Sequence, residues 1–498
     1  MLRYYFMLTV AATGLQIVSA QRPIYKNSFT ESNDYNTIKS PFSTALDLSA
    51  SASKRKIISA PGALPANKKF LSLLLWVKAG TGSSQPYNIV ESADDDTAVH
   101  QWKIGMQANG AWCWSIEDKR VHYDYLPTAK RQAINDGKWH QLAFTCNFIR
   151  NEIWLYYDGK NVAILNLSGL KSLGGRELLI GGTKKGDLGE WDLFNGAIDE
   201  IEIFDTILTP DFIEQNFHVT TPPAGKVNRP VKNISVMNFN IWHGGRETGK
   251  EIGVARIVDV IRDSGADIIS MQETYGSGPA IADALGFYFY LRSSNLSVLS
   301  RYPIGETADG YENFYNGGAQ IQITHERRLW FFTNWLNYPF YYWDRLEKGE
   351  PVDTVYWLQQ QEQVNAKRLN DILEKIEPYL QNTENVPVIF CGDFNSGSHL
   401  DWTEAARSLN RGYRILFPSS RLMEAKGFKD SFRQLHPDPV KERGITWSPA
   451  FPTAFRDRID YIYYKGKQLK PLRSFTISKH PVRYPSDHAA VVTAFSIN

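Results

Sequence analysis

The sequence predicts two folded domains of different class, an all-β sandwich followed by a domain in which strands and helices alternate. A chain of 498 residues is too long for one ordinary hydrophobic core. Residues 43–204 read as many short strands separated by turn residues, without helical periodicity between them. From residue 233 to residue 498, apolar strands alternate with amphipathic helical stripes. Between the halves, residues 219–232 are rich in Pro, Gly and Thr, which predicts a linker.

Residues 1–20 are predicted to be a cleaved signal peptide. Arg3 places a positive charge before a mostly apolar run at residues 4–18, and small residues precede Gln21, the first residue of the expected mature chain. The apolar run is too short and too interrupted by Thr, Gly and Gln to favour a membrane anchor. We therefore expect a secreted or periplasmic protein without stable membrane insertion.

The first predicted domain, residues 21–218, reads as a β-sandwich. Strands are expected at residues 71–78, 102–106, 111–116, 138–144, 152–157, 178–182 and 194–204, and a short helix at 209–217. The stretches LSLLLWVK, GKWHQLAF, LYYDGK and GAIDEIEIFDTILT resemble laminin-G-like, concanavalin-type jelly rolls. The resemblance implies a glycan or protein ligand, often with Ca²⁺. Asp199 and Glu200 could contribute to a Ca²⁺ site, although a structural turn at Asp199 is the favoured interpretation.

Three cysteines are spread over the two domains. Cys391 lies in an apolar strand and is expected in the core. Cys113 and Cys146 lie on or beside predicted strands of the first domain and could form a disulfide in an oxidising compartment. Their spacing alone does not decide between a disulfide and two free thiols.

The second predicted domain, residues 233–498, alternates strand and helix. Helices are expected at residues 252–261, 279–285, 358–376 and 402–410. Gly265 and Gly286 follow the first two of these and are suited to end them. Strands are expected at residues 236–242, 267–272, 287–291, 296–300, 319–324, 329–333, 388–391, 458–464 and 489–495.

The motif GDFN organises this second domain. Residues 388–391 read as a buried strand that Gly392 interrupts, and Asp393 and Asn395 follow two positions apart. Side chains at i and i+2 of an extended chain point the same way. The end of a buried strand is a usual place for a site in an α/β fold, where a carboxylate can activate water or bind a cation. An Asx-rich turn that caps the strand is the alternative.

Other predicted strands also end in polar residues. Asn240 lies near the end of one strand, Glu273 ends the next, and Asp460 lies in RIDYI. Asp487 and His488 form SDH near the C-terminus. The order Asn, QE, SRYPI, GDFN, RIDYI and SDH resembles the endonuclease/exonuclease/phosphatase superfamily, over roughly the last half of the chain. That superfamily includes DNase-type and apurinic endonucleases, neutral sphingomyelinases and inositol-phosphate 5-phosphatases. The resemblance implies a four-layer α/β sandwich, two packed sheets flanked by helices.

The resemblance also implies a role for each matching residue. Asn240, Glu273 and Asp487 would hold Mg²⁺ or Mn²⁺, and Mg²⁺ suits few protein ligands and several waters. Asp393 would orient or deprotonate the attacking water, and Asn395 would donate a hydrogen bond to the phosphate. His488 would act as acid or base, with Asp460 fixing its imidazole.

One position departs from the family pattern. Trp335 stands where DNase-type relatives carry a second histidine and apurinic endonucleases a tyrosine. An indole N–H can donate to a phosphate but cannot transfer a proton. His243 and His399, on the loops after Asn240 and Asn395, could compensate, and a loop-stabilising role for either is equally open.

The aromatic run WFFTNWLNYPFYYW at residues 330–343 has two interpretations. Its first part must be strand core. The part after Asn337 is broken by a proline and could line a substrate cleft that stacks on a base or sugar or encloses a cationic headgroup. Core packing is the commoner role of such residues.

These observations favour a secreted phosphoesterase that hydrolyses a phosphodiester or phosphomonoester by in-line attack of water, with the jelly roll as an accessory binding domain. The alternative is a catalytically inactive binding or adhesion protein. A net charge of +2 and a pI near 8.2 argue against a dedicated polyanion binder. Nucleic acid, a phospholipid headgroup and a phosphorylated sugar all remain open as substrates, and a monomer is expected.

Overall fold

The protein is described by a computed structural model covering residues 22–30, 32, 34–64, 68–93, 102–117, 122–170, 177–185, 190–221, 231–339 and 342–498, with the backbone alone at 184, 185, 190 and 191. The predicted signal peptide and most of the predicted linker lie outside these ranges, so secretion and the domain boundaries stay predictions. Helix α2 ends at His218, and strand β17 begins at Asn233.

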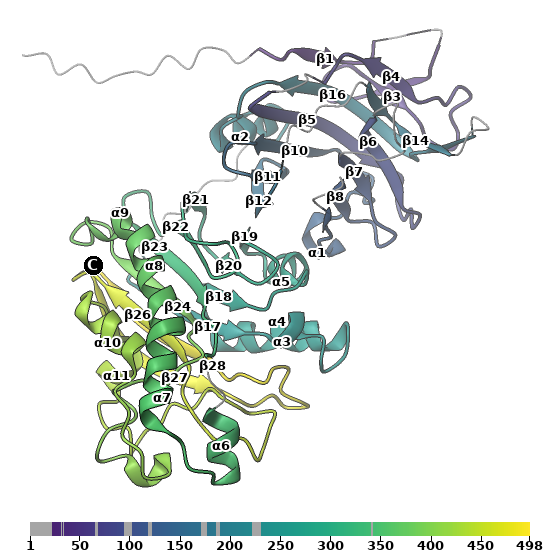
Figure 1. Ribbon diagram of the computed structural model, residues 1–498. Coiled ribbons are helices and arrows are strands. Elements are labelled where there is room, and N and C mark those ends of the chain that lie inside the picture. Colours follow the sequence, from purple (N-terminus) through teal and green to yellow (C-terminus); the bar gives the residue numbers. More distant parts are fainter. Residues whose placement is uncertain are drawn as a thin grey trace, which may run out of the picture.

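The N-terminal domain is the predicted all-β jelly roll (Figure 1). One sheet has the order β4-β13-β6-β7-β8-β9, and the facing sheet has the order β2-β3-β16-β5-β10-β11-β12. Its strands are β1 (Tyr25–Asn27), β2 (Thr37–Lys39), β3 (Thr44–Asp47), β4 (Ile58–Pro61), β5 (Phe70–Ala79), β6 (Tyr87–Ala93), β7 (Trp102–Met106), β8 (Trp112–Glu117), β9 (His122–Tyr125), β10 (His140–Asn147), β11 (Glu152–Tyr157), β12 (Lys160–Asn166), β13 (Glu177–Ile180), β14 (Gly182–Lys185), β15 (Glu190–Leu193) and β16 (Gly196–Phe204). Its helices are α1 (Ala129–Gln132) and α2 (Pro210–His218).

Strand β5 shows why its sequence is apolar at consecutive positions. Leu73 and Leu75 belong to the core between the sheets, together with Trp102 of β7. Trp76 points to the opposite face, where it stacks on Phe217 of α2 with the ring centroids 5.8 Å apart. A strand covered on both faces buries successive side chains, so it has a continuous apolar run in place of alternation.

The structure contradicts one expectation for this domain and gives a structural role to a residue of another. Cys113 of β8 and Cys146 of β10 lie in different sheets and are both free thiols, so the disulfide is not formed. Asp199 is buried and accepts hydrogen bonds from Ser40 and from the backbone N–H of Glu200, at a register shift in β16. Burial raises the pKa of Asp199 to about 6. These contacts are those of a structural bulge residue, and the Ca²⁺ role stays a prediction.

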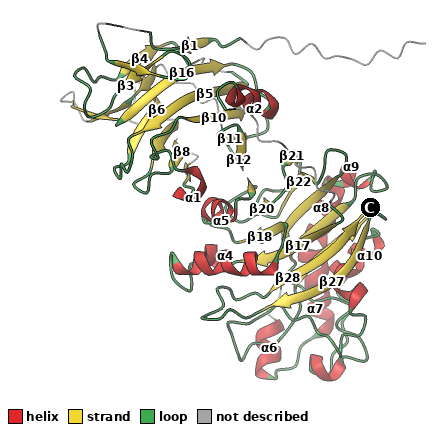
Figure 2. Ribbon diagram, turned by 180° about the vertical axis from the view of Figure 1, so that it is seen from behind, coloured by secondary structure: helices red, strands yellow, loops and turns green. Residues whose placement is uncertain are grey.

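The C-terminal domain has the four layers that the sequence predicts (Figure 2). One sheet has the order β19-β20-β18-β17-β28-β27 and the other β21-β22-β23-β24-β26-β25. Its strands are β17 (Asn233–Asn240), β18 (Ile268–Gln272), β19 (Tyr288–Leu291), β20 (Ser297–Ser300), β21 (Ile304–Ala308), β22 (Asn316–Gln322), β23 (Arg328–Trp335), β24 (Val388–Asp393), β25 (Lys429–Asp430), β26 (Asp460–Lys465), β27 (Leu469–Ile477) and β28 (Ala490–Ile497). Its helices are α3 (Trp242–Gly245), α4 (Ile252–Ser264), α5 (Gly278–Leu285), α6 (Tyr342–Lys348), α7 (Thr354–Gln360), the π-helix η1 (Gln361–Ala366), α8 (Lys367–Lys375), α9 (Glu377–Leu380), the 3₁₀ helix η2 (Arg407–Asn410), α10 (Pro418–Ala425) and α11 (Ser431–Leu435).

Apolar side chains from both sheets fill the space between them. Val236 and Ile268 on one side meet Phe331, Ile389 and the predicted core residue Cys391 on the other. Helices α4 and α5 cover the outer face of the first sheet, and α8 covers the outer face of the second. The sheets are thereby fixed face to face, which brings their strand ends together at one edge of the sandwich.

The long helix expected at residues 358–376 is interrupted. It begins earlier, as α7, and passes through the π-helix η1 before α8. Asn365 of η1 is buried and donates to the carbonyl oxygens of Asn337 (2.9 Å) and Phe394 (2.7 Å). Gln361 accepts a hydrogen bond from Ser396 at 3.0 Å. The widened turn therefore carries two polar side chains that hold the loop after β24.

The prediction of a helix at residues 402–410 was wrong. Only the 3₁₀ turn η2 forms there. Asp401 is held by Arg433 and Arg458, and the buried indole of Trp402 donates to Asp457 at 3.1 Å. These tertiary contacts replace a local helical start.

The two domains meet at a short parallel strand pair. Ile164 and Leu165 of β12 pair with Tyr290 and Leu291 of β19, so the sheets are continuous across the junction. Asp283 of α5 accepts hydrogen bonds from the jelly-roll residues Thr128 and Gln132. Of the helices in the described ranges, none is both long and apolar enough to cross a bilayer.

Candidate active site

The predicted site residues come together where the strands of both sheets end. In the first sheet, Asn240 of β17 pairs with Gln272 of β18, and Glu273 follows directly. In the second sheet, Asp393 of β24 pairs with Asp460 of β26. Asp487 and His488 precede β28, which is paired with β17. Strand register thus gathers residues that are more than 200 positions apart in the sequence.

Gly392 and Asn395 shape the GDFN motif. A Cβ atom at Gly392 would lie 2.4 Å from the carbonyl oxygen of Asn334 on β23, so only glycine permits this approach. Asn395 has a left-handed φ of 46°, a conformation that asparagine tolerates better than most residues. The tight turn keeps Asp393 and Asn395 on one side, as the sequence predicts.

Asp393 is a fully buried carboxylate. Its Oδ1 accepts the backbone N–H of Asn395 (2.9 Å), and its Oδ2 accepts the side-chain amides of Asn240 and Asn395 (3.2 Å each). Burial raises its pKa to about 8; attraction to His488 opposes this rise, and repulsion from Asp460 adds to it. Asn395 also donates to the carbonyl of Leu336 at 2.8 Å. Donation from Asn395 to a phosphate would therefore require one of these bonds to be released.

His488 forms a dyad with Asp460. Its Nδ1 lies 2.9 Å from Oδ2 of Asp460, and its Nε2 lies 3.9 Å from Oδ2 of Asp393. Burial alone would lower the pKa of His488, but attraction to Asp460 and Asp393 outweighs it and holds the pKa well above its usual range. The imidazole therefore favours the doubly protonated form, in which both ring nitrogens donate.

Asn240, Glu273 and Asp487 form the second group. Asn240 donates to Oε1 of Glu273 (3.2 Å) as well as to Asp393, while its own Oδ1 accepts the N–H of Trp242 (3.1 Å). It therefore bridges two carboxylates. Burial raises the pKa of Asp487 to about 6; attraction to His488 opposes this rise, and repulsion from Glu273 adds to it.

The chemistry of these donors fits a hard divalent cation. Asp393, Asp460 and Asp487 act on the buried imidazole of His488, and Glu273 acts on Asp487. A bound cation would relieve the mutual repulsion of these carboxylates. In the described part of the chain, one set of three ligand-type side chains has its ligand atoms within 4.8 Å of one another, Asp393, Asp460 and His488. The histidine of that set is already engaged by Asp460, which favours the oxygen-rich side at Glu273 and Asp487 for Mg²⁺ or Mn²⁺.

The three auxiliary positions have different surroundings. Trp335 ends β23, and its ring packs on Tyr315 and Phe314, with centroids 6.2 and 5.5 Å away. His243 donates its backbone N–H to Glu273 (2.9 Å), and its ring contacts Glu247 (2.8 Å). His399 contacts Ser420 and Glu424 of α10, which anchors its loop.

Several supporting residues escaped the sequence analysis. Asn238 donates to Oδ1 of Asp460 at 3.2 Å, and Gln272 donates to Oδ1 of Asn238 at 3.0 Å. Asn295 accepts the backbone N–H of Glu273, which has a left-handed φ of 56°. The one signal for Asn238 is its position two residues before Asn240, in an otherwise apolar strand. Asn295 carries no local signal.

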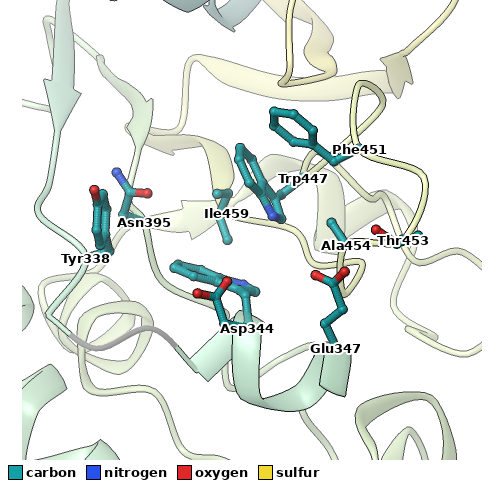
Figure 3. A pocket seen from close by; sticks show the side chains of 10 residues that line it. Tyr338, Asp344, Glu347, Asn395, Trp447, Phe451, Thr453, Ala454 and Ile459 are labelled. Carbon is teal, nitrogen blue, oxygen red and sulfur yellow. The ribbon is translucent and has the colours of Figure 1, made fainter. Parts of the chain in front are cut away.

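A cleft of about 440 Å³ opens beside the centre (Figure 3). Asn395, itself a catalytic candidate, and Ile459, which directly precedes Asp460, line it. Tyr338 and Trp343 line it from the aromatic run, and their contact with a substrate stays a prediction. Tyr342 from the same run is fully buried core. Trp447 also lines the cleft, and its ring lies edge-on against His488, 5.1 Å between centroids.

Two family models match the chain. The model of the Endonuclease/Exonuclease/phosphatase family matches residues 237–488, slightly more than half of the chain. The model of the Concanavalin A-like lectin/glucanases superfamily matches residues 53–214. The candidate centre lies inside the first match, and the jelly roll contains the second.

The chain is also similar to individual proteins. An uncharacterised protein of Caenorhabditis elegans, F14F9.5, is 28% identical over 294 residues, covering 53% of this chain and 91% of that protein. Among solved structures, TDP2 of C. elegans is 16% identical with a TM-score of 0.37, covering 53% of this chain and 74% of that one. An AP endonuclease of Archaeoglobus fulgidus is 19% identical with a TM-score of 0.37, covering 52% of this chain and 98% of that one.

Proposed function

The chain belongs to the Endonuclease/Exonuclease/phosphatase family, and from this premise we propose that it is a metal-dependent phosphodiesterase that attacks phosphorus in line with a water molecule. The observation that carries the proposal is the convergence of Asp393, the Asp460–His488 dyad and the carboxylates of Glu273 and Asp487 at one edge of two sheets. Such a gathering of buried acids is unfavourable for folding, and it is typical of catalytic sites.

Asp393 and His488 are placed to manage the protons of the reaction. Their facing atoms are 3.9 Å apart, so a single oxygen atom can hydrogen-bond to both. Burial raises the pKa of Asp393, so its ionised form is a stronger base than an ordinary carboxylate and is suited to take a proton from an attacking water. His488, held protonated by Asp460, can stabilise a phosphoryl oxygen or protonate the leaving oxygen. In this assignment the two residues hold opposite proton roles.

Glu273 and Asp487 are the residues that would hold the cation, with Asn240 positioning Glu273. When bound, Mg²⁺ or Mn²⁺ would neutralise charge on the phosphoryl oxygens and orient the ester. The residues of this chain do the rest: Asn295 fixes the backbone of Glu273, and the N–H of His243 fixes its Oε2. This support keeps the carboxylate in one orientation.

The test is turnover of bis(4-nitrophenyl) phosphate by the full mature chain, with Mg²⁺, with Mn²⁺ and with EDTA. We expect metal-dependent release of nitrophenolate, and Asp393→Asn and His488→Ala should each slow it by at least about 100-fold. Folded protein that binds Mg²⁺ but shows no turnover of phosphodiesters or phosphomonoesters would favour the rival function, an inactive binding or adhesion protein.

We also propose that the protein is secreted and that the jelly roll binds a glycan or protein. Secretion rests on the composition of residues 1–20, and the jelly-roll ligand on the family match of residues 53–214. Mass spectrometry of the mature protein from a eukaryotic secretion host should give Gln21 as the first residue. An intact N-terminus in the cell fraction would contradict secretion.

A further inference from the structure

The cleft beside the catalytic centre combines aromatic rings with unpaired acidic groups. Tyr338, Trp343, Trp447 and Phe451 supply the rings. Asp344 and Glu347 of α6 point their carboxylates into the cleft (Figure 3). Within the described part of the chain, neither carboxylate has a hydrogen-bond or ion-pair partner, and no lysine or arginine lines the cleft. Two negative charges therefore face an aromatic space without a compensating cation.

The helix that carries the acids is firmly placed. Tyr342 is fully buried among Trp357, Trp402 and Phe417, and its hydroxyl donates to Asp457 at 2.9 Å. The indole N–H of Trp343 also points at Asp457, at 3.4 Å. Because the polar atom of Trp343 is directed inward, what this side chain presents to the cleft is its aromatic ring. The acidic groups are thus held by a packed element of the fold.

The cleft is continuous with the catalytic centre. Asn395 belongs to both, Ile459 immediately precedes Asp460, and Trp447 contacts His488. A substrate that places a phosphoryl oxygen between Asp393 and His488 can direct one of its ester arms into this space. The chemistry of the cleft therefore selects that arm.

Resting on the function proposed above, we propose that this cleft binds a positively charged ammonium group, so that the substrate is a phosphoester with a cationic amino-alcohol arm. Aromatic faces attract an organic cation through their negative quadrupole, and the two carboxylates add direct attraction. A polynucleotide would instead place further phosphates beside Asp344 and Glu347, where they would be repelled, because its binding depends on Lys and Arg contacts that the cleft does not offer. Asp344 and Glu347 act as specificity-determining residues.

The test compares two substrates of one shape, 4-nitrophenyl phosphocholine and its neutral carbon isostere, 4-nitrophenyl 3,3-dimethylbutyl phosphate. In each, water adds its oxygen to phosphorus, the bond from phosphorus to the nitrophenyl oxygen breaks, and nitrophenolate leaves with the proton passing to solvent. We expect kcat/KM to favour the cationic substrate by about tenfold, the scale of a partly desolvated cation–aromatic contact. In Asp344→Asn/Glu347→Gln this preference should fall to about threefold or less.

Glu350→Gln is the matched control, because Glu350 is an exposed carboxylate just beyond α6 that does not line the cleft. It should retain the preference for the cationic substrate. A second measurement needs no variant: choline should inhibit the wild-type protein competitively, and 3,3-dimethylbutan-1-ol should not. Raising the salt concentration should weaken inhibition by choline, since the carboxylates are exposed.

The outcomes separate this inference from the proposed function. If neither substrate is turned over, the proposed function fails. If both are turned over equally and choline does not inhibit, the cation subsite is overturned while the phosphodiesterase stands. Preference for the 4-nitrophenyl ester of thymidine 5′-monophosphate over both would mean that the cleft stacks a base, which also overturns the proposal. Turnover of glycerophosphocholine or of phosphatidylcholine vesicles would uphold it and identify a soluble or a lipid source.

Discussion

Replacing Asp460 by asparagine tests how the centre controls the protons of His488. Asp460 accepts one hydrogen bond from His488 and another from Asn238. The amide of Asn238 cannot turn round, because its oxygen already accepts a hydrogen bond from Gln272. In Asp460→Asn the new amide has one oxygen for two donors. If the oxygen of the new amide keeps the hydrogen bond from Asn238, the NH₂ group of the new amide faces Nδ1 of His488. Nδ1 must then lose its proton in order to accept a hydrogen bond from that NH₂ group.

The magnitude follows from the 2.9 Å bond between a buried carboxylate and the imidazole. A hydrogen bond to a charged group contributes about 1.5–3 kcal/mol, and about 1.36 kcal/mol corresponds to one pKa unit. The pKa of His488 should therefore fall by roughly one to two units. Loss of the whole group in His488→Ala should reduce kcat by on the order of 10²–10⁴-fold, and Asp460→Asn should cause a smaller loss.

The direction of the pH effect follows from the same contacts. Attraction to Asp460 and Asp393 keeps His488 protonated to higher pH than an ordinary imidazole. Without the charge of Asp460, the protonated form is lost at a lower pH. If this form is the catalytic acid, the alkaline limb of the kcat–pH profile moves to lower pH by about one to two units, matching the change in pKa.

The assay is kcat against pH on bis(4-nitrophenyl) phosphate at saturating Mg²⁺, with melting temperatures measured for each variant. His325→Ala is the control, since His325 is exposed in the turn between β22 and β23. An alkaline limb that does not move in Asp460→Asn would refute the dyad. His243→Ala and His399→Ala form the comparison set, and a loss of kcat as large as that of His488→Ala in either would refute a mechanism with one essential histidine.

Three further results are expected. Glu273→Gln should abolish metal-dependent turnover and leave the fold intact, because its carboxylate is the most exposed of the proposed ligands; unchanged activity at limiting Mg²⁺ would exclude the ligand role. The fragment 231–498 should keep its activity on a small soluble diester, since it carries every candidate residue. Its melting temperature should be lower than that of the full chain, because β19 loses its pairing with β12. A folded but inactive fragment would show that the jelly roll is needed. In EDTA, Asp393→Asn should raise the melting temperature more at pH 8.5 than at pH 4. The reason is that a carboxyl group whose pKa is raised from 3.8 to about 8 in the folded protein destabilises the fold increasingly as the pH rises between those two values. A larger rise at pH 4 would mean that the folded protein stabilises Asp393 as a carboxylate.

The site was predictable from the sequence because strand register fixes it. A polar residue at the end of an apolar run marks a strand end, and the ends of paired strands lie together. Asn240 beside Gln272 and Asp393 opposite Asp460 follow from that rule once the strands are recognised. The roles of these residues as ligands or proton carriers stay predictions, because position alone does not determine them.

What the sequence did not reveal depends on tertiary contacts. The π-helix η1 forms where Gln361 and Asn365 reach the loop after β24, and a helical periodicity at residues 358–376 contains no sign of that loop. The missing helix at 402–410 has the same cause, since Asp401 and Trp402 are fixed by residues more than 30 positions away. The cleft was only partly foreseen, because Trp447 and Phe451 lie in a stretch without periodicity.

The position of Trp335 bears on how the centre can work with one histidine. Its ring packs against Phe314 and Tyr315, and β23 places its backbone beside Asp393. His399 is turned to α10, and His243 contacts the proposed ligand Glu273. Neither is therefore placed as His488 is, within 3.9 Å of a buried carboxylate of raised pKa. A second proton carrier is already present in Asp393, so a mechanism in which Asp393 and His488 divide the acid and base roles does not need a histidine at position 335.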